Sequence, residues 1–312
     1  MESKTYAVIG TGAIGGYYGA RLHHGGNEVH FLFNSDYDHV CHHGLKVDSH
    51  YGDFSIPADK LNAYQTSSKM PAVDVVLVAL KTTQNHLLSS LIRPLLKSNT
   101  LVVLLQNGIG AEQELAEQLD LPYVGGGLCF ICSNKLGPGH IHHLDYGRLT
   151  LGMYGEAGLP ALKQLAEGFS QSGVEVDVED KILSARWKKL LWNAPFNGLS
   201  AVLDTDTAQM MQCPEIVDLA KAIMLEVKDA AQTSGTELEI ELIETMLSNT
   251  AKMKPYLTSM LLDKRNGREL ELQYMYKNAL DMARRHQIEM PKTEALYQQL
   301  CCVNQLYKVL ID

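Results

Sequence analysis

The chain has 312 residues, a hydrophobic fraction of 46% and a formal net charge of −9. Its size and composition are those of an ordinary globular protein of about two domains. An acidic chain has no electrostatic reason to bind nucleic acid or an anionic membrane surface, so we expect neither as a partner.

Other general features narrow the class of protein further. No continuous apolar segment reaches the length of about 18 residues that a membrane span needs. The chain starts Met-Glu-Ser-Lys-Thr and leads directly into a strand-like run, which does not resemble a signal peptide. Six cysteines in a chain of this length do not indicate a disulfide framework. We therefore expect a cytoplasmic protein.

Strand-like and helical patterns alternate through the first half of the chain. The early strand-like runs lie at residues 6–10, 28–33, 73–80 and 100–106. The last two are almost wholly apolar, which is typical of parallel strands buried on both faces. The helical patterns between them predict βαβ units in a doubly wound sheet. Residues 123–152 predict later strands with a hairpin around Gly137-Pro138-Gly139, and residues 174–178 predict the last strand.

The pattern changes near residue 180, and from there helical periodicity continues almost to the end. We predict an α/β Rossmann domain with a mainly parallel sheet at residues 1–180, which binds NAD(P). An all-helical domain for substrate and catalysis should follow at residues 181–312. No low-complexity linker separates them, so a cleft between the domains is the expected ligand site.

A glycine-rich loop follows the first strand and opens a helix at residues 17–24. Its sequence fits G-x-G-x-x-G, with Gly10, Thr11, Gly12, Ala13, Ile14 and Gly15. In dinucleotide-binding folds the first glycine allows a tight turn, the second admits a pyrophosphate, and the third packs helix on strand. The strand–loop–helix context favours a dinucleotide site over a glycine-rich turn without a ligand.

In dinucleotide-binding folds, a residue at the end of the second strand normally binds the ribose of the adenosine. Here Phe33 is followed by Asn34-Ser35-Asp36, and no Arg or Lys occurs between Arg21 and Lys46. A 2′-phosphate would therefore lack its usual cation from this loop. Asp36 could accept a ribose hydroxyl, or it could cap a helix together with Ser35.

Lys81 and Asn107 come directly after the two apolar strands. The carboxyl ends of parallel strands are where ligands bind in such sheets, so both side chains are candidates for the site. Asn107-Gly108 is also an ordinary turn signal.

The segment 187–197 predicts a helix that is apolar nearly all round and therefore buried. Lys189, Asn193 and Asn197 lie along one face of it, and buried polar groups need partners. The pattern favours a lined cleft with a bound ligand, and Pro195 should kink the helix. The alternative is a surface stripe with Lys189 in solvent.

Other polar clusters do not predict a metal or redox site. Cys129 and Cys132 have redox spacing but lie in an apolar strand-like run, which favours buried structural thiols. His140, His142 and His143 lie beside the Gly-Pro-Gly turn without a cysteine or carboxylate cluster, so we expect a solvated turn.

These residues together resemble the ketopantoate reductase (2-dehydropantoate 2-reductase) family over essentially the whole chain. Beyond the glycine loop, the matching positions are Lys81, Asn107-Gly108, Lys189, Asn193, Asn197, Ser259, Glu271 and the closing turn His286–Pro291. Several ordered motifs at matching spacing are far more specific than the glycine loop alone.

The resemblance implies that NADPH reduces a 2-oxo acid, ketopantoate, to pantoate in pantothenate biosynthesis. Lys189 would donate the proton to the developing alkoxide, and Glu271 would hold the distal hydroxyl of the substrate. The substrate-orienting residues would be Asn193, Asn197, Ser259 and Asn107, with Asn107 and Lys81 also near the cofactor.

Two departures from the family pattern bear on the cofactor and on the pocket wall. Asn34 stands where the family has an arginine for the 2′-phosphate, so NADH could serve as well as NADPH. Tyr276-Lys277 replaces an Asn-Gly and could alter the pocket wall. Two alternatives remain: a reductase or opine-type dehydrogenase of another 2-oxo acid, and a dinucleotide-sensing protein without catalysis. The C-terminal helices could form a homodimer face.

Overall fold

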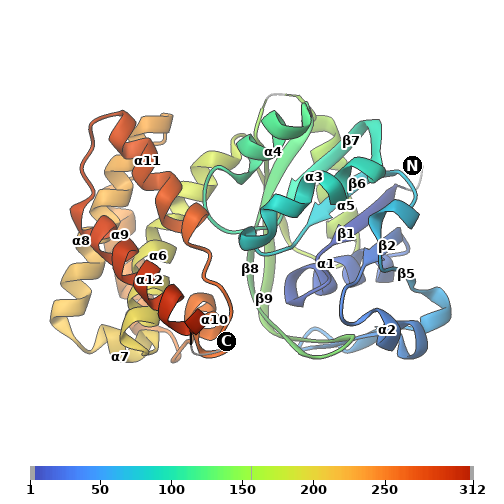
Figure 1. The fold of residues 1–312 in the computed structure, drawn as a ribbon, viewed down its shortest axis with the longest axis horizontal. Coiled ribbons are helices and arrows are strands. Elements are labelled where there is room, and N and C mark those ends of the chain that lie inside the picture. Colours follow the sequence, from blue (N-terminus) through green and yellow to red (C-terminus); the bar gives the residue numbers. More distant parts are fainter. Residues whose placement is uncertain (1–3, 156, 310–312) are drawn as a thin grey trace. The chain divides into compact units, whose positions relative to one another are not determined.

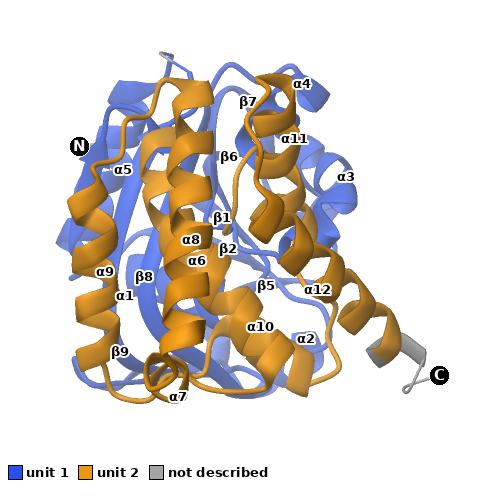
Figure 2. Ribbon diagram, turned by 90° about the vertical axis from the view of Figure 1, so that its left-hand side faces the viewer, with its two compact units in different colours: residues 1–106, 111–182 blue, residues 107–110, 183–312 orange. Residues whose placement is uncertain are grey.

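The computed structural model describes residues 4–155 and 157–309. The chain divides into two compact units, which Figure 2 shows in blue and orange. Unit 1 comprises residues 1–106 and 111–182, and unit 2 comprises residues 107–110 and 183–312. The short loop 107–110, which the sequence places in the first domain, therefore groups with the helical unit.

Unit 1 is built on one sheet, which has ten strands among the described residues (Figure 1). The strands are β1 Thr5–Ile9, β2 Glu28–Leu32, β3 Leu45–Ser49, β4 Phe54–Ile56, β5 Asn62–Tyr64, β6 Val73–Val78, β7 Leu96–Leu104, β8 Val124–Gly137, β9 His140–Met153 and β10 Val176–Glu179.

The strand order is β4-β3-β9-β8-β7-β6-β1-β2-β5, and β10 pairs with β9. All these pairs are parallel except β3 with β4 and β8 with β9. The chain leaves β1 toward β2 on one side and later returns as β6 on the other side. This reversal makes the carboxyl end of β1 the topological switch point, where open α/β sheets bind ligands.

The helices of unit 1 cover the sheet. They are α1 Ala13–His24, α2 Tyr37–His43, α3 Leu88–Ile92, α4 Ala111–Leu119 and α5 Leu159–Gln171, with short 3₁₀ turns at Ala58–Lys60, Ser67–Lys69, Thr82–Leu87 and Arg93–Leu95. Val8 packs with residues of α1 and α5 in one core cluster. Its neighbours Ala7 and Ile9, which point to the other face of the strand, are also fully buried. A parallel strand buried on both faces explains why the runs read as continuous apolar sequence.

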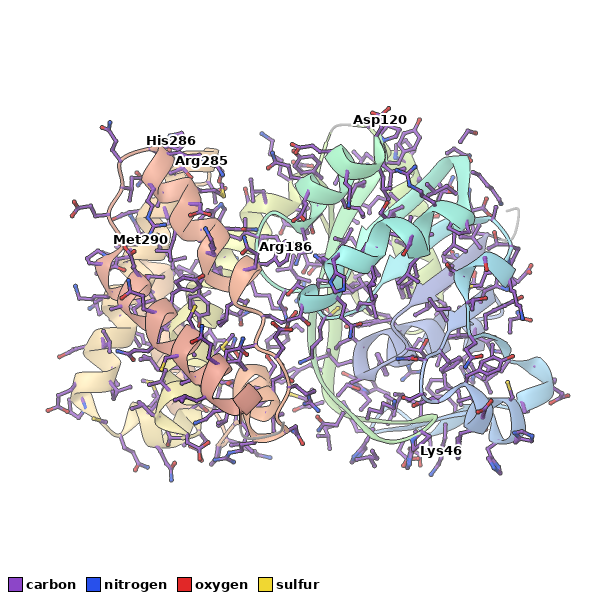
Figure 3. All side chains as sticks on the ribbon, viewed as in Figure 1. Lys46, Asp120, Arg186, Arg285, His286 and Met290 are labelled. Atoms are coloured by element: carbon purple, nitrogen blue, oxygen red, sulfur yellow. The ribbon has the colours of Figure 1, made fainter. Side chains whose placement is uncertain are left out.

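Unit 2 is helical. Its elements are α6 Ile182–Leu203, α7 Thr207–Met211, α8 Pro214–Ala231, a 3₁₀ turn Gln232–Ser234, α9 Ile240–Lys252, α10 Ser259–Arg265, a π-helix Gln273–Lys277, α11 Asn278–Arg285 and α12 Pro291–Val309. Side chains of α6, α8, α11 and α12 share one hydrophobic core. His286 and Met290, labelled in Figure 3, lie in the turn between α11 and α12.

The predicted fold class is confirmed, including the hairpin at Gly137–Gly139 and the last strand. Two local predictions were wrong. His143 lies in β9 and is 1% exposed, because its Nδ1 accepts from Ser49 and its Nε2 donates to the carbonyl of Tyr146. Cys129 and Cys132 are half-buried free thiols on β8 and not fully buried ones.

Candidate active site

The glycine loop lies at the carboxyl end of β1. Gly10 has a φ of +92°, and a Cβ there would lie 2.5 Å from the amide nitrogen of Leu80. A Cβ on Gly15 would lie 2.3 Å from the carbonyl oxygen of Gly10. Both glycines are therefore required by the protein's own backbone packing.

Gly12 is different, because a Cβ at this position would meet nothing within 4 Å. It is the N-cap of α1, and no side chain caps that helix end. The first amides of α1 therefore face open space at the end of a helix dipole, an arrangement that binds phosphate groups. The loop fits the pyrophosphate of a dinucleotide.

The glycine loop contacts the ends of the neighbouring strands β2 and β6. The buried hydroxyl of Thr11 donates to the carbonyl of Leu32 over 2.9 Å, which holds the loop against the end of β2. Leu80, which packs on Gly10, accepts from Nε2 of Gln106 over 2.9 Å. Lys81 follows Leu80 directly, so the structure brings this residue beside the loop, as the sequence predicts.

Asp36 lies just after β2, and its carboxylate is hydrogen-bonded to other groups of the protein. It precedes α2, but its side chain does not cap that helix. Its carboxylate instead accepts from Nζ of Lys135 at 2.6 Å and from the amide of Gly139 at 2.9 Å. Burial raises the pKa of Asp36, but these hydrogen bonds outweigh it and hold the pKa below its ordinary value.

Lys135 is a cation that sequence reasoning missed. It lies on β8, 99 positions from Asp36, and its side chain is 34% exposed. No local pattern could have found it, because the pairing depends on how the β8–β9 hairpin folds back onto the end of β2. Asn34, two residues before Asp36 in the sequence, is exposed to solvent.

In unit 2, α6 carries three of the predicted residues at four-residue spacing. Lys189 is half-buried, whereas its neighbour Lys188 is exposed. Asn193 and Asn197 are 8% and 3% exposed. The prediction of a buried helix is confirmed, and Lys189 is not part of a fully solvated stripe. The helix continues through Pro195 as one element.

Asn197 joins α6 to the start of α10. Its Oδ1 accepts from the hydroxyl of Ser259 at 3.3 Å and from the amide of Met260 at 3.4 Å. One turn later Ser200 shares a 2.6 Å hydrogen bond with Thr258, the N-cap of α10. Two residues far apart in the sequence, Asn197 and Ser259, are thus in direct contact.

The π-helix Gln273–Lys277 holds the loop that carries Asn107. The amide of Ile109 donates to the carbonyl of Tyr274 over 2.9 Å. The side chain of Asn278 donates to the carbonyl of Ile109 over 2.7 Å. A Cβ on Gly108 would lie 2.4 Å from the carbonyl oxygen of Tyr274. These contacts explain why the loop 107–110 belongs to unit 2.

Glu271 is half-buried and lies directly before these π-helical turns. The sequence predicts it on a helix, and this was wrong. The amide of Leu272 donates to the carbonyl of Leu270, so the chain makes a tight turn around Glu271 before the helical bonds begin at Leu272. The turn places Glu271 at the entry to the π-helix.

The predicted residues thus form two groups. The loop Gly10–Gly15, Asn34 and Lys81 belong to unit 1, and Asn107, Lys189, Asn193, Asn197, Ser259 and Glu271 belong to unit 2. In the part of the chain that the structure describes, no group of three or more His, Cys, Asp or Glu side chains could hold a metal ion. No described helix has both the length and the apolar character to cross a membrane.

Comparison with known proteins decides the family. A family model described as ketopantoate reductase PanE/ApbA matches residues 6–156, and the model of its C-terminal part matches residues 181–302. The chain belongs to the ketopantoate reductase family. The two matched regions correspond to unit 1 and unit 2.

Individual members of the ketopantoate reductase family agree with this assignment. A 2-dehydropantoate 2-reductase of Nostoc sp. is 46% identical and covers 96% of this chain and 95% of its own length. The crystal structure of a 2-dehydropantoate 2-reductase from Geobacter metallireducens superposes with a TM-score of 0.91 at 38% identity, over 95% of this chain and 98% of the other. As a ketopantoate reductase family member, the protein is an oxidoreductase with a Rossmann-type dinucleotide fold.

The same fold occurs in a D-mandelate dehydrogenase solved with NADH and anilino(oxo)acetate. That structure has a TM-score of 0.89 and 23% identity, over 97% of this chain and 99% of the other. At this identity the likeness shows the fold alone, and a shared fold does not fix the substrate.

Proposed function

We propose that the protein reduces 2-dehydropantoate (ketopantoate) to pantoate with NAD(P)H, a step of pantothenate biosynthesis. The observation that carries the proposal is the polar cluster of unit 2, in which buried Asn197, on the helix that also bears Lys189, contacts Ser259 at the start of α10. The proposal assigns the keto acid to this cluster and the dinucleotide to the glycine loop of unit 1.

The chemistry adds a hydride to the ketone carbon and a proton to its oxygen. When bound, the reduced nicotinamide supplies the hydride. Lys189 donates a proton from Nζ to the oxygen as negative charge develops there, and its ammonium stabilises that charge beforehand. Asn107 orients the keto group from the loop that the π-helix holds.

The remaining side chains hold the two ends of the substrate. The Oδ1 of Asn197 already accepts from Ser259 and Met260, so its Nδ2 is the end that can donate to a substrate oxygen. Asn193, one turn earlier on α6, presents a second amide to the carboxylate. Ser259, whose hydroxyl donates to Asn197, fixes the orientation of the Asn197 amide. Glu271 accepts the hydrogen bond of the distal hydroxyl.

The first test is turnover of ketopantoate and of trimethylpyruvate, which is ketopantoate without the hydroxyl. We expect the wild-type protein to prefer ketopantoate, with Glu271→Ala raising the KM for ketopantoate and removing most of that preference. A site built for a hydroxyl discriminates strongly against the analogue that lacks it. Equal activity on both acids would favour the alternative, a reductase of another 2-oxo acid. Dinucleotide binding without turnover of either acid would favour a sensing protein.

The structure also bears on the choice between NADPH and NADH. Asn34 offers no charge to a 2′-phosphate, and Asp36 is already paired with Lys135. The paired carboxylate neither repels a phosphate nor accepts freely from a ribose hydroxyl, and the ammonium of Lys135 remains partly exposed. We therefore propose NADPH as the preferred cofactor, with Lys135 supplying the cation that Asn34 does not.

Replacing Lys135 by alanine is expected to lower the NADPH-to-NADH ratio of kcat/KM by roughly 5- to 10-fold, because one partly solvated charge–phosphate contact is lost. The matched control is Lys46→Ala. Lys46 (Figure 3) is also paired with an aspartate in unit 1, Asp48, and its side chain is 58% exposed. An unchanged ratio in the Lys135 variant would contradict the assignment.

A homodimer of this chain remains a proposal. A ketopantoate reductase from Staphylococcus aureus described as dimeric has the same fold at 22% identity. Sedimentation of the purified protein would test it.

A further inference from the structure

Tyr276 is the least expected side chain in unit 2. It stands where the sequence departs from the family pattern, it is 0% exposed, and it lies within the π-helix Gln273–Lys277. π-helical turns are rare and occur mostly at functional sites. A buried phenol also needs a hydrogen-bonding partner.

The partner of Tyr276 is the backbone of α6. Its hydroxyl donates to the carbonyl of Ala194 over 2.8 Å. Burial raises the pKa of Tyr276 well above its ordinary value.

In the hydrogen-bond ladder of an α-helix, the amide of residue 198 pairs with the carbonyl of residue 194, four residues earlier. The Tyr276 hydroxyl donates to that carbonyl and lies against Gly198, so it bridges the π-helix to this turn of α6. The ladder is already weakened here, since Pro195 has no amide to donate to Leu191. A Cβ at position 198 would lie 2.5 Å from the hydroxyl, so the glycine leaves room for it.

The bridged turn carries two proposed substrate residues, because Asn193 precedes Ala194 and Asn197 precedes Gly198. In the same π-helix, the carbonyl of Tyr274 accepts a hydrogen bond from the amide of Ile109, next to the Asn107-Gly108 turn. The π-helix begins just after Glu271. The π-helix is therefore hydrogen-bonded to the loop of Asn107 and also to the turn of α6 at residues 193–198, the asparagine turn.

We propose that Tyr276 is a positioning residue that fixes the asparagine turn of α6 relative to Glu271, and so sets the fit of the 2-oxo acid. The proposal rests on the proposed function for the identity of the acid. It does not depend on that function for the geometry, which a measurement without substrate can test.

The kinetic test is Tyr276→Phe, which removes only the hydroxyl. We expect the KM for ketopantoate to rise roughly 5- to 10-fold while kcat falls less than about 3-fold and the KM for NADPH is unchanged, because uniform substrate binding is lost. The control is Tyr297→Phe, a partly buried tyrosine of α12, which should leave all three constants unchanged. A lowered melting temperature with an unchanged KM for ketopantoate would overturn the proposal.

A second variant tests the bridge itself. Gly198→Ala pushes a methyl group against the hydroxyl and against the side chain of Leu296, and it should raise the same KM. Because the clash between the methyl group and the hydroxyl is absent from the double variant, its rise in KM should be smaller than the product of the two single effects. Fully additive effects would show that the two residues act independently and would contradict the bridge.

Hydrogen exchange keeps the proposal testable if the wild-type protein does not reduce ketopantoate. In Tyr276→Phe, the amides of Gly198 and its α6 neighbours should exchange at least about 10-fold faster, while those of α12 are unchanged. Faster exchange without wild-type turnover would refute the proposed function and retain the bridge. Unchanged exchange would refute the bridge whatever the activity.

Discussion

Replacing Lys189 by alanine lowers kcat for ketopantoate by about 100-fold or more, as expected for the loss of a general acid that also stabilises the developing charge. The half-buried position of Lys189 on the helix of Asn193 and Asn197 supports this expectation. The measurement is steady-state oxidation of NADPH at saturating keto acid, with the cofactor affinity determined separately.

Lys188 provides the matched control for that experiment. It is the adjacent lysine of α6, and it is exposed. Lys188→Ala removes the same charge from the same helix and should leave kcat within about 2-fold, because surface substitutions away from such sites have small effects. Equal losses in both variants would point to helix charge or stability. A near-normal kcat in Lys189→Ala would remove this residue from the mechanism.

Replacing Gly12 by alanine is expected to remove most of the dinucleotide affinity without unfolding the protein. The backbone of Gly12, at φ −90° and ψ −155°, is open to alanine, and the added Cβ meets nothing within 4 Å. The methyl group instead occupies the space before the uncapped amides of α1, where a pyrophosphate must approach. Losing one charge-assisted hydrogen bond of about 1.5–3 kcal/mol corresponds to roughly a 10- to 100-fold higher Kd.

Two other glycines make this experiment specific. Gly155→Ala also adds a Cβ in open space and should change neither the Kd for NADPH nor the melting temperature. Gly15→Ala should destabilise the fold, since its Cβ would lie 2.3 Å from the carbonyl of Gly10. Calorimetric titration and thermal unfolding of the three variants separate lost binding from lost folding. Unchanged affinity in Gly12→Ala would place the pyrophosphate elsewhere.

Much of the fold could be predicted from local sequence because its signals are local. The run 73–80 is apolar on both faces apart from Asp74, which favours a buried parallel strand, and β6 occupies Val73–Val78. The glycine loop is equally explicit, since its G-x-G-x-x-G spacing stands between a strand and a helix within a few residues. The buried helix with Lys189, Asn193 and Asn197 followed from periodicity alone.

Other features have no local signal. Glu271 lies in a sequence with helical character, yet it is in a turn, because the π-helix starts after it and tertiary packing overrides propensity. His143 looked like a residue of a solvated turn until β9 placed it against Ser49 and buried it. The grouping of Asn107 with unit 2 depends on the hydrogen bonds that Ile109 makes with the distant residues Tyr274 and Asn278.

The sequence by itself determined the fold class, the glycine loop and the common face of Lys189, Asn193 and Asn197, since spacing along a strand or helix fixes which side chains share a face. Ser259 and Glu271 were found only through the family resemblance. Only the tertiary structure decided which distant groups meet. Lys135 pairs with Asp36, which lies 99 positions away in the sequence. The hydroxyl of Tyr276 donates to the carbonyl of Ala194 in α6, which lies 82 positions away. Such pairings depend on how elements pack, and packing is set by the whole core and not by any local pattern.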